Sequence, residues 1–415
     1  MVEIKKRKLL AKLFAEKDRQ KIAIILGPRQ VGKTTLLKEL HKKLGGLFLD
    51  LDVLENFEKV GSFERLINTL KLNGYEEKQK GTFYLFLDEF QHYDVMTKIM
   101  KNVFDNCKNV KIYASGSSSL KIKEQVQESL AGRKSIYYLY PLDFEEFLWF
   151  KEEEEALKQY KNAGKLEGED LNLGVLEGLL CEYLVWGGYP EVVLGRGADE
   201  KQDVLKSIFD LYVKKELVNY LKLEDVVGAK RLVEFLAVNN GKKIKYEEAA
   251  SACALKQYAV RAYMGVLGET FLIKTIRPFF TNKNKELVKM PKAYFLDNGV
   301  RNFFINNFNE VDIREDAGRL FESFVMQELI KGGVEELKFW EDKQKREVDF
   351  VIDLVSRQTA IEVKFKERLK AEDFLGLNAF LDEYDTDEAY LVNLGAQKKG
   401  KIELRLPFGI GEMKF

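Results

Sequence analysis

Residues 27–34 read Gly-Pro-Arg-Gln-Val-Gly-Lys-Thr and match the phosphate-loop pattern G-x-x-x-x-G-K-T. Glycines in such a loop let backbone N–H groups turn inward around phosphates, and the following helix adds the positive end of its dipole. Lys33 would neutralise the β- and γ-phosphates, and the Thr34 hydroxyl would coordinate Mg²⁺. The pattern predicts a site for ATP and Mg²⁺, with these nucleotide-binding residues: Gly27, Pro28, Arg29, Gln30, Val31, Gly32, Lys33, Thr34 and Thr35.

The other half of this site is expected where the apolar run 83–87 ends in Asp88 and Glu89. A carboxylate at the carboxyl end of a buried strand can hold the magnesium ion, and we assign that role to Asp88. Glu89 would orient or deprotonate the attacking water.

Two further residues are catalytic candidates. Ser115 ends another apolar run, where it would contact the γ-phosphate or the water, or else belong to a Ser/Gly loop that caps the next helix. Arg133 would stabilise charge in the transition state, with an unrelated surface salt bridge as the alternative.

The elements that must position these residues follow from the apolar pattern. Short apolar runs predict buried parallel strands, and the segment 33–44 between the first two reads as a helix. Such alternation indicates a parallel α/β sheet covered on both faces. The expected strands are 22–26, 47–51, 83–87, 110–114 and 135–139.

Composition excludes several other classes of protein. Lys+Arg and Asp+Glu both count 67, so the chain is not a globally basic nucleic-acid binder, although a local basic patch stays open. Only His41 and His92 are histidines, which argues against a histidine-rich metal site or a Ser–His–Asp hydrolase. The three cysteines form no disulfide or metal pattern, and no apolar run is long enough for a membrane helix or signal peptide. We therefore expect a cytoplasmic protein with no membrane contact.

The remainder of the 415-residue chain predicts further domains. Three short helices at 231–238, 246–253 and 257–267, followed by an apolar run at 271–276, are typical of a winged helix. We predict an ATPase core over residues 1–150, a helical lid or linker over 151–225, a winged helix over 226–285 and a C-terminal domain over 290–415.

Residues 347–365 carry a second group of chemistry-bearing side chains. With a strand period of two and a turn centred on Ser356–Arg357, Asp349 lies opposite Lys364, with Glu362 diagonal to it on the same face. Such a D…E-x-K arrangement could bind one or two Mg²⁺ ions and activate water for phosphodiester cleavage. A surface hairpin with alternating charges would produce the same pattern.

Several motifs in this order resemble those of prokaryotic AAA-type ATPases, in the broader AAA+/STAND group, that carry a C-terminal domain of unknown function. They are Gly-Pro-Arg-Gln-Val-Gly-Lys-Thr-Thr, Leu-Asp-Glu-Phe-Gln, Ser-Gly-Ser-Ser-Ser, Leu-Ala-Gly-Arg, Tyr-Pro-Leu-Asp-Phe-Glu-Glu-Phe and Gly-Gly-Tyr-Pro-Glu-Val-Val. The resemblance spans nearly the whole chain. It implies an α/β architecture with a P-loop AAA+-like core, a helical lid, a winged helix and a C-terminal domain of restriction-endonuclease-like, PD-(D/E)xK fold.

The resemblance also extends the C-terminal site. A helix glutamate often completes the metal site of that nuclease fold, which adds Glu322 to Asp349 and Glu362, with Lys364 beside them. Many AAA+ proteins reach a neighbour's ATP with an arginine; only Arg133 is a candidate here, so formation of a homo-oligomer stays open.

Two hypotheses for the output remain. In the first, ATP turnover drives DNA binding or processing, with Lys256, Gln257 and Arg261 of the winged helix touching phosphates or base edges. In the second, a nucleotide-dependent switch binds a protein partner, and the C-terminal domain is a catalytically silent docking module. The presence of Glu322, Asp349, Glu362 and Lys364 favours the first hypothesis. Neutral net charge, the lack of a clear basic stripe and the nearby acids Glu247, Glu248 and Glu269 favour the second.

Overall fold

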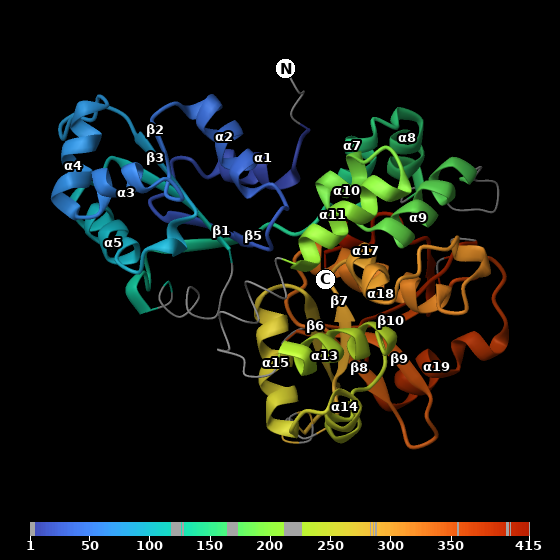
Figure 1. Cartoon of the computed structure of the whole chain (residues 1–415). Helices are drawn as coiled ribbons and strands as arrows, with labels where there is room; N and C mark the ends of the chain where they lie inside the picture. Colours follow the sequence, from blue (N-terminus) through green and yellow to red (C-terminus); the bar gives the residue numbers. More distant parts are fainter. Residues whose placement is uncertain are drawn as a thin grey trace. The chain divides into compact units, whose positions relative to one another are not determined.

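The chain folds into two compact units, residues 1–141 with 269–271 and residues 142–268 with 272–415 (Figure 1). The computed structural model describes residues 5–414 apart from these: 118–125, 127, 164–172, 211–225, 283, 285, 287–288, 355–356, 396–397 and 399.

A parallel sheet forms the centre of the first unit. In its described part the sheet has five strands in the order β2-β3-β4-β1-β5, and each neighbouring pair runs parallel. The predicted parallel α/β sheet is therefore confirmed. The strands are β1 (Ile22–Gly27), β2 (Leu47–Asp50), β3 (Phe83–Asp88), β4 (Val110–Ser117) and β5 (Lys134–Tyr138).

Amphipathic helices pack on this sheet. Helix α2 (Lys33–Leu44) has the predicted bounds and buries Leu36, Leu37 and Leu40, which recur at helical spacing on one face. Ahead of α1, Arg7 donates from Nη1 to the Val31 carbonyl and from Nη2 to the Tyr140 carbonyl, both at 2.7 Å. The other helices of this unit are α1 (Lys8–Ala15), α3 (Leu54–Val60), α4 (Phe63–Leu72), η1 (Phe90–His92) and α5 (Met96–Asn106).

The second unit combines helices from widely separated parts of the sequence around one aromatic interior. Phe144 of α7 (Phe144–Lys151) packs edge-to-face on Tyr183 of α9 (Gly174–Trp186) and on Phe324 of α18 (Ala317–Lys331). The Phe144 amide donates to both carboxylate oxygens of Glu328, at 3.2 and 3.3 Å. Helix α7 is thus part of the second unit, although the sequence analysis places it at the end of the ATPase core.

Three helices of this unit lie over segments that were expected to be helical. Helix α14 has the predicted bounds, and α13 and α15 extend theirs by a few residues. Besides α7, α9 and α18, the described helices of this unit are α8 (Glu154–Ala163), α10 (Pro190–Leu194), α11 (Ala198–Asp210), α13 (Val226–Val238), α14 (Tyr246–Cys253), α15 (Gln257–Glu269), α17 (Asn298–Phe304), η3 (Val311–Ile313), η4 (Ala371–Phe374), α19 (Leu375–Glu383) and η5 (Ile410–Glu412).

A mixed sheet runs through the second unit. Its described part has seven strands in the order β12-β11-β10-β9-β8-β6-β7. The strand after the three helices of the expected winged helix, β6, pairs antiparallel with β7 and parallel with β8, so it belongs to the same sheet as the C-terminal strands. Neither a winged helix nor an endonuclease-like domain is confirmed as a separate fold. The strands are β6 (Ile273–Pro278), β7 (Lys292–Phe295), β8 (Lys338–Glu341), β9 (Glu347–Leu354), β10 (Arg357–Val363), β11 (Glu388–Val392) and β12 (Glu403–Arg405).

The predicted register of the β9–β10 hairpin is wrong by two residues. Arg357 pairs with Leu354 and Ile361 with Phe350, and one further step in this register sets Glu362 opposite Asp349. Arg357 is therefore a strand residue and not part of the turn, while Ser356 lies outside the described residues. Because the shift is an even number, the same side chains still share one face of the sheet.

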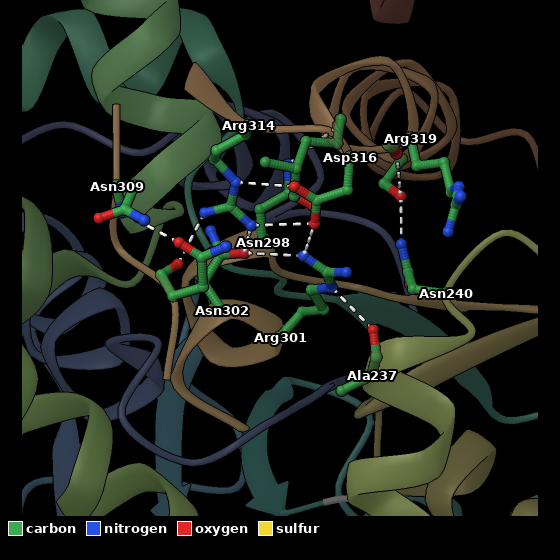
Figure 2. Close-up of polar contacts among 12 residues, drawn as sticks. Ala237, Asn240, Asn298, Arg301, Asn302, Asn309, Arg314, Asp316 and Arg319 are labelled. Atoms are coloured by element: carbon green, nitrogen blue, oxygen red, sulfur yellow. Dashed lines mark hydrogen bonds and ion pairs between the residues drawn. The ribbon is translucent and has the colours of Figure 1, made fainter. Parts of the chain in front are cut away.

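A buried ion network joins the helices of the second unit (Figure 2). Arg314 holds Asp316 with two hydrogen bonds of 2.8 and 3.0 Å, and Arg301 contacts the same carboxylate. Arg301 also donates from Nε to the Ala237 carbonyl at 2.8 Å, and both arginines donate to Asn302. Burial opposes the charge on Asp316, but the Arg314 hydrogen bonds and the Arg301 charge outweigh it and lower the pKa of this carboxyl to about 2.

Replacing Asp316 by Asn should destabilise the second unit, because the Arg301 and Arg314 side chains, only 3% and 1% exposed, lose their counter-charge. We expect the free energy of unfolding near neutral pH to fall by about 3 kcal/mol. The folded pKa lies below the unfolded value of about 3.9, so this contribution is complete above about pH 5 and is lost as pH falls toward 2. Denaturant unfolding across that pH range should show that the difference in free energy of unfolding between wild type and Asp316→Asn becomes smaller as pH falls. Asp312→Asn, at an exposed position, is the control; a gap independent of pH would contradict the assignment.

Candidate nucleotide site and C-terminal carboxylate cluster

The phosphate loop lies between a fully buried strand and the start of α2. A Cβ on Gly27 would meet the Leu139 carbonyl oxygen at 2.1 Å, so only glycine fits where β1 ends. Gln30 and Gly32 have φ angles of 60° and 91°, in the left-handed region that turns the loop back on itself. Lys33 is buried, and its Nζ donates to the carbonyls of Gly27 at 3.1 Å and Pro28 at 2.8 Å. The loop thus carries its own cation at its centre.

The carboxyl ends of three adjacent strands bring the predicted magnesium ligands together. Since β4 lies between β1 and β3, Ser115 of β4 reaches Asp88 of β3 and donates a hydrogen bond to its Oδ1. Burial raises the pKa of Asp88, and hydrogen bonds from Ser115 and Thr34 work in the opposite direction. A buried carboxylate beside two hydroxyl groups is a set of hard oxygen donors, which fits Mg²⁺.

Glu89 follows Asp88 in a constrained conformation. Its φ is 54°, a left-handed value that is uncommon for a non-glycine residue, and its amide donates to Ser115 Oγ at 3.4 Å. The Glu89 carboxylate accepts a hydrogen bond from Gln91 Nε2, and His92 Nε2 lies 4.0 Å from it. The sequence patterns predict no role for Gln91 or His92, although Gln91 lies within the Leu-Asp-Glu-Phe-Gln motif.

The prediction that Arg133 stabilises transition-state charge at the nucleotide of its own chain is wrong. Its carbonyl accepts from the amide of Ile22, and Ile22 pairs with Lys134, so Arg133 lies at the amino ends of β1 and β5. The phosphate loop follows the opposite end of β1. The guanidinium group is instead held by both carboxylate oxygens of Asp105, at 2.7 and 3.1 Å, which matches the salt-bridge alternative.

In the second unit the four predicted C-terminal residues and one further lysine form a group, which we call the C-terminal cluster: Lys292, Glu322, Asp349, Glu362 and Lys364. Lys364 Nζ donates to Glu362 Oε1, and the Val363 amide donates to Asp349 Oδ2 at 2.8 Å. Burial, together with the charges of Glu362 and Glu322, raises the pKa of Asp349.

Lys292 is the member that the sequence analysis missed. It is buried on β7 and pairs with Glu322 at 3.5 Å and with Glu347, while the Tyr294 hydroxyl also donates to Glu322. The spacing Lys-x-Tyr places both side chains on one face of β7, which is the signal that could have identified them.

The cluster fits a metal ion only in part. Glu362 Oε2 is buried without a hydrogen-bond partner, as an oxygen awaiting a cation would be. Glu322, by contrast, already pairs with Lys292 and accepts a hydrogen bond from Tyr294. The described residues also contain no group of three or more Asp, Glu, His or Cys side chains that could hold a metal ion. The predicted three-carboxylate metal site is therefore not assembled.

The face proposed for nucleic acid lies on α15 and just before it. Lys256, Gln257 and Arg261 are exposed as expected, and Tyr258 between them is 70% exposed. The Arg261 guanidinium lies over the Tyr246 ring, 4.1 Å from its centroid, which fixes its direction.

Comparison with protein-family models divides the chain into three segments. Residues 19–148 match the AAA domain (AAA_14), residues 177–311 match a domain of unknown function (DUF8612), and residues 317–408 match another (DUF4143). Among the described residues, every helix is too short or too polar to cross a membrane.

Two relatives are similar in sequence over most of the chain. An uncharacterized protein of Methanocaldococcus jannaschii is 28% identical over 347 residues, covering 80% of this chain and 72% of its own. An uncharacterized protein of Haemophilus influenzae is 26% identical, covering 88% and 87%. The Walker-type ATPase of Pyrococcus abyssi superposes with a TM-score of 0.48 at 14% identity, covering 73% of this chain and 96% of that one.

The AAA match covers the sheet, including the strand end at Asp88 and Glu89 and the loop that leads to Lys33. This chain therefore contains an AAA-type P-loop domain built to bind a nucleotide, followed by two segments that match domains of unknown function.

Proposed function

We propose that this protein is an ATPase that binds ATP with Mg²⁺ and hydrolyses the γ-phosphate. The observation that carries the proposal is the convergence of Lys33, Asp88 and Glu89 at the carboxyl edge of one parallel sheet. Ligands of open α/β sheets bind at this edge, where strand ends and helix N-termini meet.

Each residue of the site has a role that follows from its position. Backbone N–H groups of residues 27–34 and the Lys33 ammonium would hold the phosphates, so Lys33 would leave the carbonyls of its own loop to meet them. Thr34 and Asp88, with Ser115 hydrogen-bonded to Asp88, would hold Mg²⁺, which when bound neutralises charge on the phosphate oxygens. The metal site needs the ionised form of Asp88, which the two hydroxyl hydrogen bonds favour.

The chemical step is hydrolysis of a phosphoanhydride. Water attacks the γ-phosphorus in line with the β–γ bridge, the bond from that phosphorus to the bridging oxygen breaks, and ADP leaves with the electron pair. Glu89 accepts the proton of the attacking water. Gln91 and the Ser115 hydroxyl hold the Glu89 side chain and backbone, and would orient that base.

Glu89→Gln should retain ATP binding and lower the turnover rate by about 100-fold or more, because the amide cannot accept the proton. Lys33→Ala should instead weaken ATP affinity by about 10- to 100-fold, since a charged hydrogen-bond donor to the phosphates is lost. Phosphate release and equilibrium binding of a fluorescent ATP analogue measure the two effects separately. Glu64→Gln, an exposed change of the same kind on α4, should alter neither quantity. Full turnover in Glu89→Gln would refute the assigned base.

The output of the ATPase is proposed to be DNA binding by the α15 face. Lys256, Gln257 and Arg261 present cationic and amide donors around an exposed Tyr258, and these groups suit phosphate oxygens and base edges. DNA cleavage at Glu322, Asp349 and Glu362 is not included, because Glu322 is already occupied by Lys292. A protein-binding switch is the competing output, and homo-oligomer formation is independent of both.

Lys256→Ala combined with Arg261→Ala should weaken binding of a DNA duplex and reduce the slope of log affinity against log salt by about 2, one for each lost phosphate contact. Fluorescence anisotropy over a salt series, with ATP and without it, gives both numbers. The matched control is Lys42→Ala with Lys43→Ala, which removes two exposed positive charges from the first unit. Equal losses in both double variants, or no DNA binding by wild type, would instead favour the protein-binding output.

A further inference from the structure

Lys292 and Glu322 of the C-terminal cluster line a pocket whose charged side chains are mostly cationic. The pocket has a volume of about 320 Å³ and is lined by Lys242, Lys243, Lys292, Arg319, Glu322 and Glu347, with Gly241 at its edge. A volume of that size accommodates a phosphate group with its neighbouring sugar atoms. These side chains come from the segment after α13, from β7, from α18 and from the start of β9, so distant parts of the second unit build it together.

Some charged side chains of the pocket are paired with opposite charges and others are not. Both carboxylates are neutralised from within, since Lys292 pairs with Glu322 and Glu347 and the Tyr294 hydroxyl donates to Glu322. Lys243 pairs with Glu341. For Arg319 and Lys242, neither side chain has a hydrogen bond or ion pair to any described residue. In Figure 2 the Arg319 guanidinium stands apart from the nearby Asp316 network.

The backbone under these cations is fixed. The Gly241 amide donates to the Ala293 carbonyl and the Ile244 amide to the Pro291 carbonyl, both at 2.8 Å, and Lys243 forms a β-bridge with Lys292. Asn240 binds the Phe295 amide at 2.8 Å and Ser323 Oγ at 2.7 Å, which joins this segment to β7 and α18. The backbone that carries Lys242 is therefore held in place, so its ordering opposes ligand binding little, and only the side chains must be ordered.

We propose that this pocket binds a phosphate group of a nucleic-acid backbone, with Arg319 and Lys242 as its direct contacts. The two uncommitted cations complement the charge of a phosphodiester, and a guanidinium can grip two of its oxygens at once. A polyanion is favoured over a single free phosphate by the loop between β8 and β9. That loop carries exposed Lys343 and Lys345 and leads directly into Glu347 of the pocket.

This site is separate from the α15 face and extends the proposed DNA output to a second contact on the same unit. It is independent of ATP hydrolysis. Nothing in it requires a metal ion, because the contacts are made by the chain's own cations.

The test uses the full chain and fluorescence anisotropy of labelled single- and double-stranded oligonucleotides. Arg319→Gln with Lys242→Gln should weaken binding by about 10-fold or more and lower the salt slope by about 2. The matched control, Arg196→Gln with Lys158→Gln, removes the same two side-chain types from exposed positions of the same unit and should leave binding unchanged. An oligonucleotide of the same sequence with an uncharged methylphosphonate backbone should bind wild type no better than it binds the double variant.

The possible outcomes separate this inference from the rest of the proposal. Loss in the pocket variant with retained ATPase activity supports the site, and Lys242→Gln alone, an exposed change, repeats the test if Arg319→Gln fails to fold. Unchanged binding in the pocket variant, with loss in the Lys256→Ala and Arg261→Ala variant, overturns the pocket while keeping the α15 face. If inorganic phosphate binds in a manner that depends on Arg319 and the oligonucleotides do not bind, a free phosphate is the ligand and the nucleic-acid assignment fails.

Discussion

The nucleotide site depends on one constraint, the parallel alignment of β1, β4 and β3 with β4 in the middle. Parallel strands end at a common edge, so the phosphate loop, Ser115 and Asp88 meet there without any special loop to carry them. The constraint also explains the burial of Asp88. A carboxylate at the end of a central strand loses water, and the hydroxyl groups of Ser115 and Thr34 partly replace it. The same alignment sets Arg133 at the far edge, where it cannot act on its own nucleotide.

The second unit is held together in a different way. Its helices come from both sides of the α13–α15 segment and converge on the aromatic group around Phe144, Tyr183 and Phe324. The Asp316 network then joins α17 and the start of α18 to the end of α13 through Arg301 and the Ala237 carbonyl. With β6 paired to β8, these contacts bring the segments predicted as a lid, a winged helix and a C-terminal domain into one compact unit.

Lysines neutralise carboxylates inside the second unit. Lys292 and Lys364 each lie against carboxylates of the C-terminal cluster, and the remaining cations of the adjacent pocket face outward. A cluster neutralised in this manner can persist without a metal ion, while its rim stays attractive to an anion. The zero net charge of the chain therefore conceals a local excess of positive charge, of the kind that composition alone could not exclude.

Local sequence patterns predicted the elements around the candidate nucleotide site and most of its candidate residues. Gly27 through Thr34 are contiguous, and the strand, loop and helix around them follow from local apolar patterning, which is why α2 has its predicted bounds. Asp88 and Glu89 were predicted because they directly follow an apolar run, which marks the carboxyl end of a buried strand. The other features depend on contacts between segments that are distant in the sequence. Strand order placed Ser115 on Asp88 and removed Arg133, and hairpin register paired Asp349 with Glu362 rather than with Lys364. Lys292, Lys242 and Arg319 share a pocket only because separate elements meet in space, and no local pattern encodes such long-range proximity.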